Sequence, residues 1–456
     1  MVCDRENKSD LKFQNFKING NRSLKGQIKI SGAKNSSLVL LAASLLSDET
    51  ITLRNVPNLT DIDKMKNILK SLGVLLKSEG EDLVISPQNL HLCELPYELV
   101  NGLRASFFCI GPLLTKVGEA TLALPGGCKI GERPIEEHIK GLKALGAKII
   151  IEDGLVKARI NNNEKRLKGT NIKLNCPSVG ATETLIMAST LAEGRTIIEN
   201  AAREPEVQDL CFMLNKMGVN IYGAGQSKII IEGVTKLKGC SHKVIPDRIE
   251  AGTFLIAAAS TFSSITVSPV IPNHLDSVIE KLRESGSKIT INGNSISIKT
   301  NSIKAVNIQT APFPGFPTDL QAPFTALMSI ANGQSKISET IFENRMSHIK
   351  SLNQMGASIV VEDNTAFING VQFLNGESLK GQDLRSSAAI TIAALAAKGI
   401  SRIEGLEHLD RGYENFENKL SNIGAEISRE NAKNINHESK LSLDKSNKHT
   451  KNYQAA

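Results

Sequence analysis

Residues 142–160 read LKALGAKIIIEDGLVKARI, and this pattern of a helix-like segment, a glycine and a β-rich stretch recurs along the chain. Five further copies occupy residues 69–86, 214–233, 282–299, 352–370 and 420–430. The glycines of the six copies follow one another at intervals of about 70 residues and are Gly73, Gly146, Gly218, Gly286, Gly356 and Gly424. Each glycine stands where a helix end needs a left-handed residue, and the alternating apolar residues after it are typical of a hairpin. The sequence therefore predicts six copies of one α/β unit.

A second element recurs in the same phase, an apolar segment opened by polar or charged residues. Its six copies are residues 31–46, 103–114, 177–192, 247–260, 317–331 and 383–397. Because these segments are apolar on all sides, we expect buried helices, with the amphipathic helices that end at the repeated glycines outside them. Six units divide naturally into three plus three, which predicts two α/β domains. A solenoid is the alternative, but solenoid repeats are typically shorter, about 20–50 residues.

The composition supports large cores and gives little sign of a nucleic-acid surface. Of the 456 residues, 41% are hydrophobic but only 4% are aromatic, so the cores must be filled with Ile, Leu, Val and Ala. This mix suits helices packed on sheets better than the stacking surfaces of nucleic-acid binders. The net charge of +7, from 54 Lys and Arg against 47 Asp and Glu, is compatible with anionic substrates.

The cysteines and the N-terminal stretch indicate a reducing compartment. The seven cysteines are odd in number and have no Cys-x-x-Cys spacing, which argues against a disulfide framework and a zinc site. The opening MVCDRENKSDLK is charged where a signal peptide is apolar, and the apolar runs are too short and broken to span a bilayer. We expect a soluble intracellular protein. The polar residues 1–11 and 431–456 are expected to be disordered.

The starts of the buried helices carry polar residues that indicate an anion site. The residues of N-cap type are Ser31, Ser178, Asp247, Asp319 and Asp383. The cations near such helix starts are Lys34, Arg104, Arg248 and Arg385. If these helix N-termini face a common cleft, their free N–H groups and positive charge favour the binding of anions.

Ten short motifs, spread over residues 12–428, carry a resemblance to a known family. In order they are SGAKNSS, RASFF, LPGGCKIGERP, SVGATET, ENAAREPE, PDRIEAGTF, FPTDLQAPF, FENR, DLRSSA and DRGYE. Together they resemble the UDP-N-acetylglucosamine enolpyruvyl transferases. The resemblance implies a two-domain inverse α/β barrel with three repeats in each domain. It also implies the boundaries: residues 12–33 and 247–430 form one domain, and residues 34–246 form the other, which carries a mobile loop around Cys128.

The family's activity supplies an expected function. It is the transfer of the enolpyruvyl group of phosphoenolpyruvate to the 3-hydroxyl of UDP-N-acetylglucosamine, with release of phosphate, at the start of peptidoglycan synthesis. The resemblance implies that no metal or other cofactor is needed. We expect a cytoplasmic monomer or weak homo-oligomer with no nucleic-acid or membrane partner. Such chemistry needs an acid near C3 of phosphoenolpyruvate, a base near the hydroxyl, and cations around the phosphate and carboxylate.

Cys128 lies in the glycine-rich stretch LPGGCKIGERP, where the neighbouring Lys129 and Arg133 favour a reactive thiolate. The alternative is an ordinary surface thiol on a hairpin turn. By resemblance, Cys128 is the proton donor, Arg133 contacts substrate phosphates, and fosfomycin reacts with the thiol. The pair Lys34 and Asn35 implies a phosphoenolpyruvate contact, although a lysine at a helix start can also be there simply for solvation.

Asp319 matches the family's general base, and an N-cap role is the alternative. Arg345, Arg385 and Arg411 match arginines around phosphoenolpyruvate, and their planar forks suit carboxylate and phosphate. Salt bridges with Asp383 or Asp410 are the alternative for these arginines.

The resemblance also implies contacts to the sugar nucleotide. The residues concerned are Arg104, Arg133, Pro134, Ile135, Glu136, Glu137, Ser178, Val179, Gly180, Asp319 and Ile341. Cys176 and Pro177 replace a more polar pattern of some relatives, which puts one diphosphate contact in doubt.

Two other functions remain open. The shikimate-pathway enolpyruvyl transferase shares the fold and the donor, but it typically has an Asp-Lys-Ser run where this chain has Ala33, Lys34, Asn35 and Ser36. A non-catalytic relative that only binds the sugar nucleotide should have lost Cys128, Asp319 or an arginine, and this chain has them all.

Overall fold

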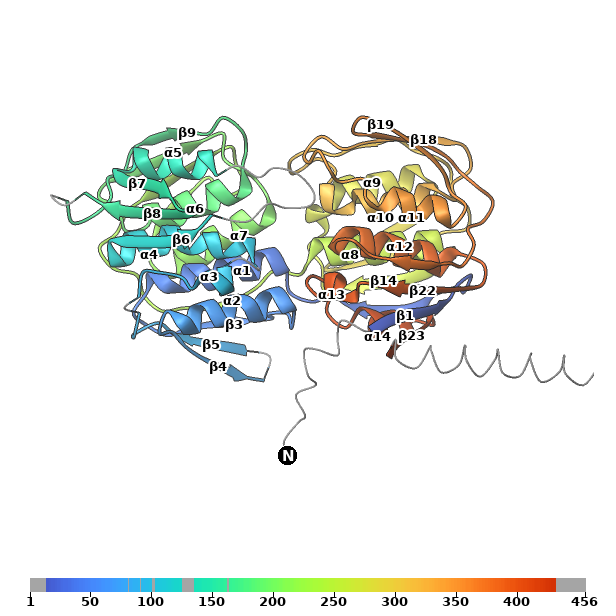
Figure 1. The fold of residues 1–456 in the computed structure, drawn as a ribbon, viewed down its shortest axis with the longest axis horizontal. Helices are drawn as coiled ribbons and strands as arrows, with labels where there is room; N and C mark the ends of the chain where they lie inside the picture. The colour runs from blue at the N-terminus through green and yellow to red at the C-terminus, as the bar shows by residue number, and fades with distance from the viewer. Residues whose placement is uncertain are drawn as a thin grey trace, which may run out of the picture.

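The computed structural model describes residues 14–80, 82–90, 92–100, 103–124, 135–161 and 164–431. These residues form two lobes, each with its own hydrophobic core (Figure 1). The core of lobe A draws on residues 33–244, and the core of lobe B draws on residues 16–30 and 249–425. The segments predicted to be disordered, residues 1–11 and 431–456, lie outside the described residues except for Asn431, which ends a strand.

Lobe A contains three α/β units in sequence. The first comprises α1 (Lys34–Ala43), η2 (Ser44–Leu46), β3 (Ile51–Arg54), α2 (Thr60–Ser71), β4 (Leu75–Glu79) and β5 (Asp82–Ser86). The second comprises α3 (Tyr97–Val100), η3 (Arg104–Cys109), α4 (Ile110–Val117), β6 (Glu119–Ala123), α5 (Glu136–Ala144), β7 (Ala147–Glu152) and β8 (Leu155–Ile160). The third comprises β9 (Asn171–Lys173), α6 (Val179–Ser189), β10 (Arg195–Glu199), α7 (Pro205–Lys216), β11 (Asn220–Tyr222) and β12 (Lys228–Glu232), and β13 (Ser241–Lys243) follows it.

Lobe B repeats this arrangement and adds the strands β1 (Gln14–Asn19) and β2 (Lys25–Lys29). The fourth unit comprises α8 (Arg248–Ser260), β14 (Ser264–Ser268), η4 (Pro272–His274), α9 (Asp276–Glu284), β15 (Lys288–Asn292) and β16 (Ser295–Lys299). The fifth comprises β17 (Ile308–Gln309), η5 (Thr318–Leu320), α10 (Gln321–Met328), β18 (Gln334–Ser338), α11 (His348–Gln354), β19 (Ser358–Glu362) and β20 (Thr365–Asn369). The sixth comprises β21 (Ser378–Lys380), α12 (Leu384–Ala396), β22 (Ile400–Glu404), α13 (Leu406–Leu409), α14 (Phe416–Ser421) and β23 (Glu426–Asn431).

The predicted repeat is confirmed in the backbone. All six repeated glycines are left-handed, with φ between 92° at Gly73 and 105° at Gly286. Five of the units form a four-stranded sheet, and the second forms a three-stranded one. In the four-stranded sheets an edge strand pairs in parallel and the other pairs are antiparallel, as in β17-β18-β20-β19.

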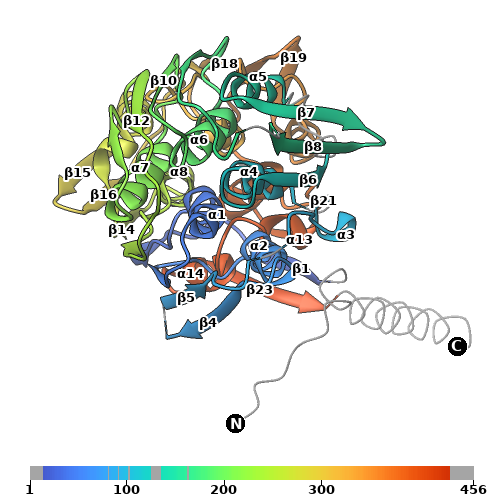
Figure 2. The same cartoon turned by 90° about the vertical axis from the view of Figure 1, so that its left-hand side faces the viewer.

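The apolar segments form the predicted buried helices at the centre of each lobe. In α8, for example, every residue after Arg248 is buried. Figure 2 looks onto lobe A, with α1, α4 and α6 inside and the strands around them. The amphipathic helices α2, α5 and α7 pack against these central helices and bury one side only.

The chain crosses between the lobes twice, at residues 30–33 and 244–247. These segments pair side by side: the Ala33 N–H donates to Ile245 O at 2.8 Å, and the Asp247 N–H donates to Ser31 O at 2.9 Å. A side chain at Gly32 would place its Cβ 1.8 Å from the Asn55 carbonyl oxygen, so the close approach requires glycine there. The two strands before the first crossing belong to lobe B: β2 pairs with β14, and β1 lies between β22 and β23 (Figure 1).

Within the described residues, no helix combines the length and the apolar character needed to cross a membrane.

Candidate active site

Lys34 is the first residue of α1 and follows the first crossing directly. Its backbone N–H donates to Asp247 Oδ2 at 3.1 Å, while the other oxygen of Asp247 caps α8 through the N–H groups of Ile249 and Glu250. One carboxylate therefore fixes the starts of two buried helices, one in each lobe. The predicted N-cap roles of Asp247, Ser178 and Asp383 are confirmed.

Ser31 was predicted as an N-cap and this is wrong. The N-cap position of α1 belongs to Ala33, which has no side-chain cap, and Asp247 takes over the capping from the other lobe. The Ser31 hydroxyl instead bonds to side chains of lobe B.

The ammonium group of Lys34 lies 3.7 Å from Asp61 Oδ2, in the first turn of α2. Burial lowers the pKa of Lys34, the carboxylate of Asp61 partly offsets this, and the charge of Arg385 lowers it further. Asp319 and Arg411 are also close enough to act on this pKa. Charged groups from both lobes therefore meet at Lys34.

Asp319 lies in the short helix η5 and does not cap α10, so the N-cap alternative is wrong. One of its oxygens accepts a hydrogen bond from Arg345, and the other accepts from Arg385 Nη2 at 2.7 Å. Burial alone would raise the pKa of Asp319, but the guanidinium groups of Arg385 and Arg345 hold it well below its usual range. The carboxylate is therefore ionised at neutral pH and shared between two arginines.

The arginines have partners other than those of the alternative prediction. Arg345 and Arg385 pair with Asp319, and Arg411 pairs with Asp61 at 2.9 Å. Asp410 pairs with Arg429. Arg385 Nη1 also donates to the Tyr413 hydroxyl at 3.0 Å. The side chain of Arg411 is 41% exposed, whereas those of Arg345 and Arg385 are nearly buried, so Arg411 is the most accessible of the three.

The backbone of Ile341 is linked to Arg345 through the side chains of Glu339 and Thr318. Its N–H donates to Glu339 Oε1 at 2.8 Å, and Glu339 Oε2 accepts from the Thr318 hydroxyl at 2.8 Å. Thr318 Oγ1 in turn accepts from Arg345 Nη1 at 2.8 Å. The loop after β18 is thus tied to the segment that carries Asp319.

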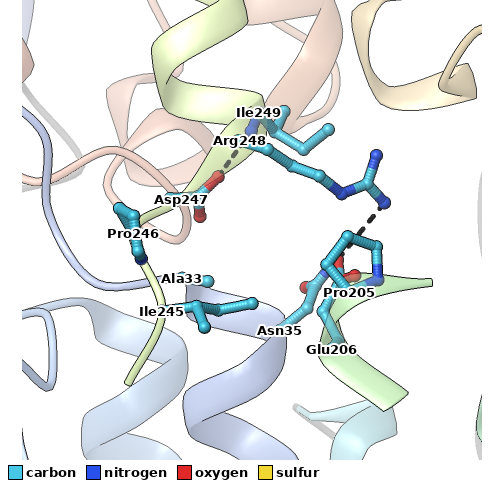
Figure 3. A pocket seen from close by; sticks show the side chains of 9 residues that line it. All are labelled: Ala33, Asn35, Pro205, Glu206, Ile245, Pro246, Asp247, Arg248 and Ile249. Carbon is cyan, nitrogen blue, oxygen red and sulfur yellow. Dashed lines mark hydrogen bonds and ion pairs between the residues drawn. The ribbon is translucent and has the colours of Figure 1, made fainter. Parts of the chain in front are cut away.

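A small pocket lies beside the crossings, and Asn35 is on its wall (Figure 3). The starts of α1, α7 and α8 surround it, and Arg248 Nη2 lies 3.4 Å from Glu206 Oε1 across it. Another contact between the lobes lies nearby, where the Phe313 N–H donates to Glu204 Oε1 at 3.2 Å.

Most of the described residues that were predicted to contact the sugar nucleotide lie elsewhere in lobe A, whereas Asp319 and Ile341 are in lobe B. Arg104 begins η3, which packs against α1 and α6, and Ser178, Val179 and Gly180 form the start of α6. A Cβ on Gly180 would lie 3.1 Å from His138 Nε2. Ile135 precedes α5, Glu136 is exposed, and Glu137 accepts hydrogen bonds from the Asn175 backbone and side chain. Cys176 is exposed beside them.

His138 was not predicted, although it lies beside Gly180 at the start of α6. Burial, and then the charge of Arg104, lower the pKa of His138 to about 4, so its imidazole is neutral at pH 7. Its folded pKa lies below the usual 6.5, so its contribution to stability is present above pH 6.5 and is lost as the pH falls toward 4.

We therefore expect the free energy of unfolding of the wild type, relative to that of His138→Gln, to fall by about 2 kcal/mol between pH 7 and pH 5. Urea unfolding at both pH values measures this. An unchanged difference would contradict the neutral buried imidazole.

Cys128, Arg133 and Pro134 were predicted in the site and lie outside the described residues. Asp61 and Tyr413 were not predicted, although both lie within the site. A signal for Tyr413 existed, because it stands two residues after the predicted Arg411 in DRGYE. In the described parts of the chain, no cluster of three or more His, Cys, Asp or Glu has a geometry suited to a metal.

Comparison with known proteins gives consistent matches. The family model described as EPSP synthase (3-phosphoshikimate 1-carboxyvinyltransferase) matches residues 18–420. A UDP-N-acetylglucosamine 1-carboxyvinyltransferase of Prochlorococcus marinus (strain MIT 9312) is 66% identical over 456 residues, which are 100% of both chains. One from strain MIT 9515 is 70% identical over 430 residues, 94% of each chain.

Solved structures of low sequence identity share the fold. The enolpyruvyl transferase NikO from Streptomyces tendae has a TM-score of 0.82 at 23% identity, over 91% of this chain and 98% of its own. EPSP synthase from Acinetobacter baumannii has a TM-score of 0.70 at 20% identity, over 91% of this chain and 100% of its own. These likenesses confirm the predicted inverse α/β barrel.

Proposed function

The chain belongs to the EPSP synthase family of enolpyruvyl transferases, and on that basis we propose that it transfers the enolpyruvyl group of phosphoenolpyruvate to the 3-hydroxyl of UDP-N-acetylglucosamine. The product would be a precursor of peptidoglycan. The names of relatives that are 66–70% identical favour this acceptor over shikimate 3-phosphate.

The observation that carries the proposal is the convergence of four cationic side chains from both lobes. Lys34 comes from lobe A, and Arg345, Arg385 and Arg411 come from lobe B. Only two carboxylates, Asp61 and Asp319, pair with them in these contacts. Such an excess of positive charge at a lobe interface suits a small substrate with a phosphate and a carboxylate.

In the proposed reaction, the sugar oxygen bonds to C2 of phosphoenolpyruvate while its proton passes to Asp319. Cys128 gives a proton to C3. The C2–O bond to phosphate then breaks as C3 returns a proton to the Cys128 thiolate, which forms the enol ether, releases phosphate and restores the thiol. Lys34, Arg345, Arg385 and Arg411 hold the anionic groups and stabilise the charge that develops on them.

The ion pairs of Asp319 suggest how a weak base becomes useful. Two guanidinium groups hold its pKa well below the usual range. When Arg345 and Arg385 also bind the anionic phosphoenolpyruvate, its negative charge offsets part of the effect of the two guanidinium groups on Asp319, and the pKa of Asp319 rises. The base is then strengthened only when the donor is present.

We also propose that the sugar nucleotide binds to Arg104, Asn35 and the start of α6, with Ile341 and the stretch from Arg133 to Glu137 around it. The domain boundaries are those implied by the resemblance, residues 34–246 and residues 12–33 with 247–430. The enzyme needs no cofactor and acts in the cytoplasm as a monomer or weak homo-oligomer.

The test is phosphate release with phosphoenolpyruvate and each acceptor in turn. Turnover with UDP-N-acetylglucosamine supports the proposal. Turnover with shikimate 3-phosphate alone would assign the shikimate-pathway reaction, and binding of the sugar nucleotide without any turnover would indicate a non-catalytic relative.

Arg385→Lys should weaken the use of phosphoenolpyruvate far more than sugar-nucleotide binding. Arg385 uses two separate nitrogens for Asp319 and Tyr413, and a lysine cannot reproduce this fork. The expected loss in kcat/KM for phosphoenolpyruvate corresponds to about 2–3 kcal/mol. Steady-state kinetics with each substrate varied in turn measures this, and equal weakening of both would show a structural role.

A further inference from the structure

Ser31 lies in the first crossing and forms hydrogen bonds with three charged side chains of lobe B, Glu250, Glu414 and Lys419. Lys419 Nζ donates to Ser31 Oγ at 2.7 Å and to Glu250 Oε1 at 2.6 Å. The Ser31 N–H donates to Glu250 Oε2 at 2.7 Å, and the Ser31 hydroxyl donates to Glu414 Oε2. A hydroxyl can donate one hydrogen bond while it accepts others, and Ser31 uses both capacities here.

Glu414 also forms a hydrogen bond with lobe A. Its Oε1 accepts from the Asn58 N–H at 2.7 Å, two residues before α2 begins. The same helix start carries Asp61, which pairs with both Lys34 and Arg411. The Thr60 N–H also donates to the Asp410 carbonyl at 3.3 Å. The segment from Asp410 to Glu414 is therefore held against lobe A at several points.

The rest of this segment is fixed within lobe B. Asp410 accepts two hydrogen bonds from Arg429, at 2.8 and 3.0 Å. The Tyr413 hydroxyl bonds to Thr253 at 2.9 Å and to Arg385 at 3.0 Å. Arg411 lies between these anchors and is the one cation of the segment that reaches across to lobe A.

We propose that Ser31 and Glu414 are positioning residues for the reaction. They tie the crossing and the start of α2 to the Asp410–Glu414 segment, so that Arg411 is presented to the donor in one geometry. The inference rests on the proposed function. Neither residue needs to touch a substrate, because each acts through Arg411 and Asp61.

The buried pair of Lys419 and Glu250 supports this role for Ser31. A buried ion pair is weak evidence for stability by itself, since desolvation opposes the attraction. Here the Ser31 N–H donates to Glu250, and the Ser31 hydroxyl accepts from Lys419. The two buried charged groups therefore have these hydrogen bonds only when the first crossing lies in its observed position. The pair of Lys419 and Glu250 thus holds the first crossing in position rather than simply adding stability.

The decisive variant is Ser31→Ala, with Ser31→Thr as the conservative rescue. Loss of the hydroxyl should raise the KM for phosphoenolpyruvate roughly 10- to 100-fold, because small displacements of a positioning group have effects of this size. The KM for UDP-N-acetylglucosamine should change far less, and Ser31→Thr should restore the KM for the donor. Ser421→Ala, on the exposed side of the helix that carries Lys419, should behave as the wild type.

Each outcome decides the proposal. An unchanged KM for the donor in folded Ser31→Ala overturns it, and so does a fall in kcat alone, which would mean fewer folded molecules. If Ser31→Ala does not fold, Glu414→Gln replaces it. The amide keeps only one of the two oxygens that accept from Ser31 and Asn58. An unchanged KM for phosphoenolpyruvate in Glu414→Gln then overturns the proposal. A wild-type enzyme that releases no phosphate overturns the proposed function, and this inference with it.

Discussion

Asp319→Asn should lower kcat by about 10²- to 10⁴-fold, the range expected for loss of a general base. The amide keeps the shape of the side chain but cannot accept a proton from the sugar hydroxyl. It also cannot balance the charges of Arg345 and Arg385, which both bond to this carboxylate. Phosphate release at saturating substrates measures kcat, and thermal unfolding reports the accompanying loss of stability.

Loss of stability alone must be separated from loss of the base. Glu417→Gln is the matched control, because Glu417 also pairs with an arginine of lobe B, Arg429, at 2.7 Å. This variant should be destabilised but keep kcat near the wild-type value. If Asp319→Asn also retained kcat within a few-fold, Asp319 would not be the base.

Cys128→Ser should abolish most turnover, whereas Cys128→Asp should keep a measurable rate and escape fosfomycin. A carboxylic acid and a thiol can both deliver a proton, but a serine hydroxyl is too weak an acid at neutral pH. Only the thiolate attacks the epoxide, with opening of the ring and formation of one carbon–sulfur bond. Intact mass spectrometry should show a single adduct on the wild type, faster with UDP-N-acetylglucosamine bound and slower with phosphoenolpyruvate.

The other cysteines provide internal controls for this reaction. Burial raises the pKa of Cys109 and, with the charge of Glu183, that of Cys211 to about 12, so neither should react. Cys176 is exposed, and Cys176→Ser should leave the adduct unchanged. An adduct on the peptide that contains Cys176 or Cys109 would remove Cys128 from the site.

The fold could be predicted from the sequence because its signals are local and repeated six times. A glycine such as Gly146 ends a helix whatever its distant neighbours are, and its left-handed φ of 95° follows from the local pattern. Buried helices such as α8 can likewise be predicted locally, because their segments have apolar residues on every side.

The partners of the site residues could not be predicted in this way. Ion pairs such as Arg411–Asp61 join residues far apart in sequence and in different lobes, so no spacing indicates them. The N-cap reading of Asp319 was wrong because two guanidinium groups compete for its carboxylate more strongly than backbone N–H groups. Ser31 failed as a cap for a similar reason, since Asp247 reaches α1 across the crossing.

The place of β1 and β2 in lobe B has a consequence for the order of events on the ribosome. Both strands are synthesised before any element of lobe A, yet β2 pairs with β14 and β1 pairs with β22 and β23. Once β13 has been made, every strand of lobe A has its partners, whereas the partners of β1 and β2 have not yet been synthesised. Such waiting strands expose unpaired backbone groups, which are templates for wrong association. The later lobe in translation thus depends on β2 having stayed unpaired until β14 emerges and on β1 having stayed unpaired until β22 emerges.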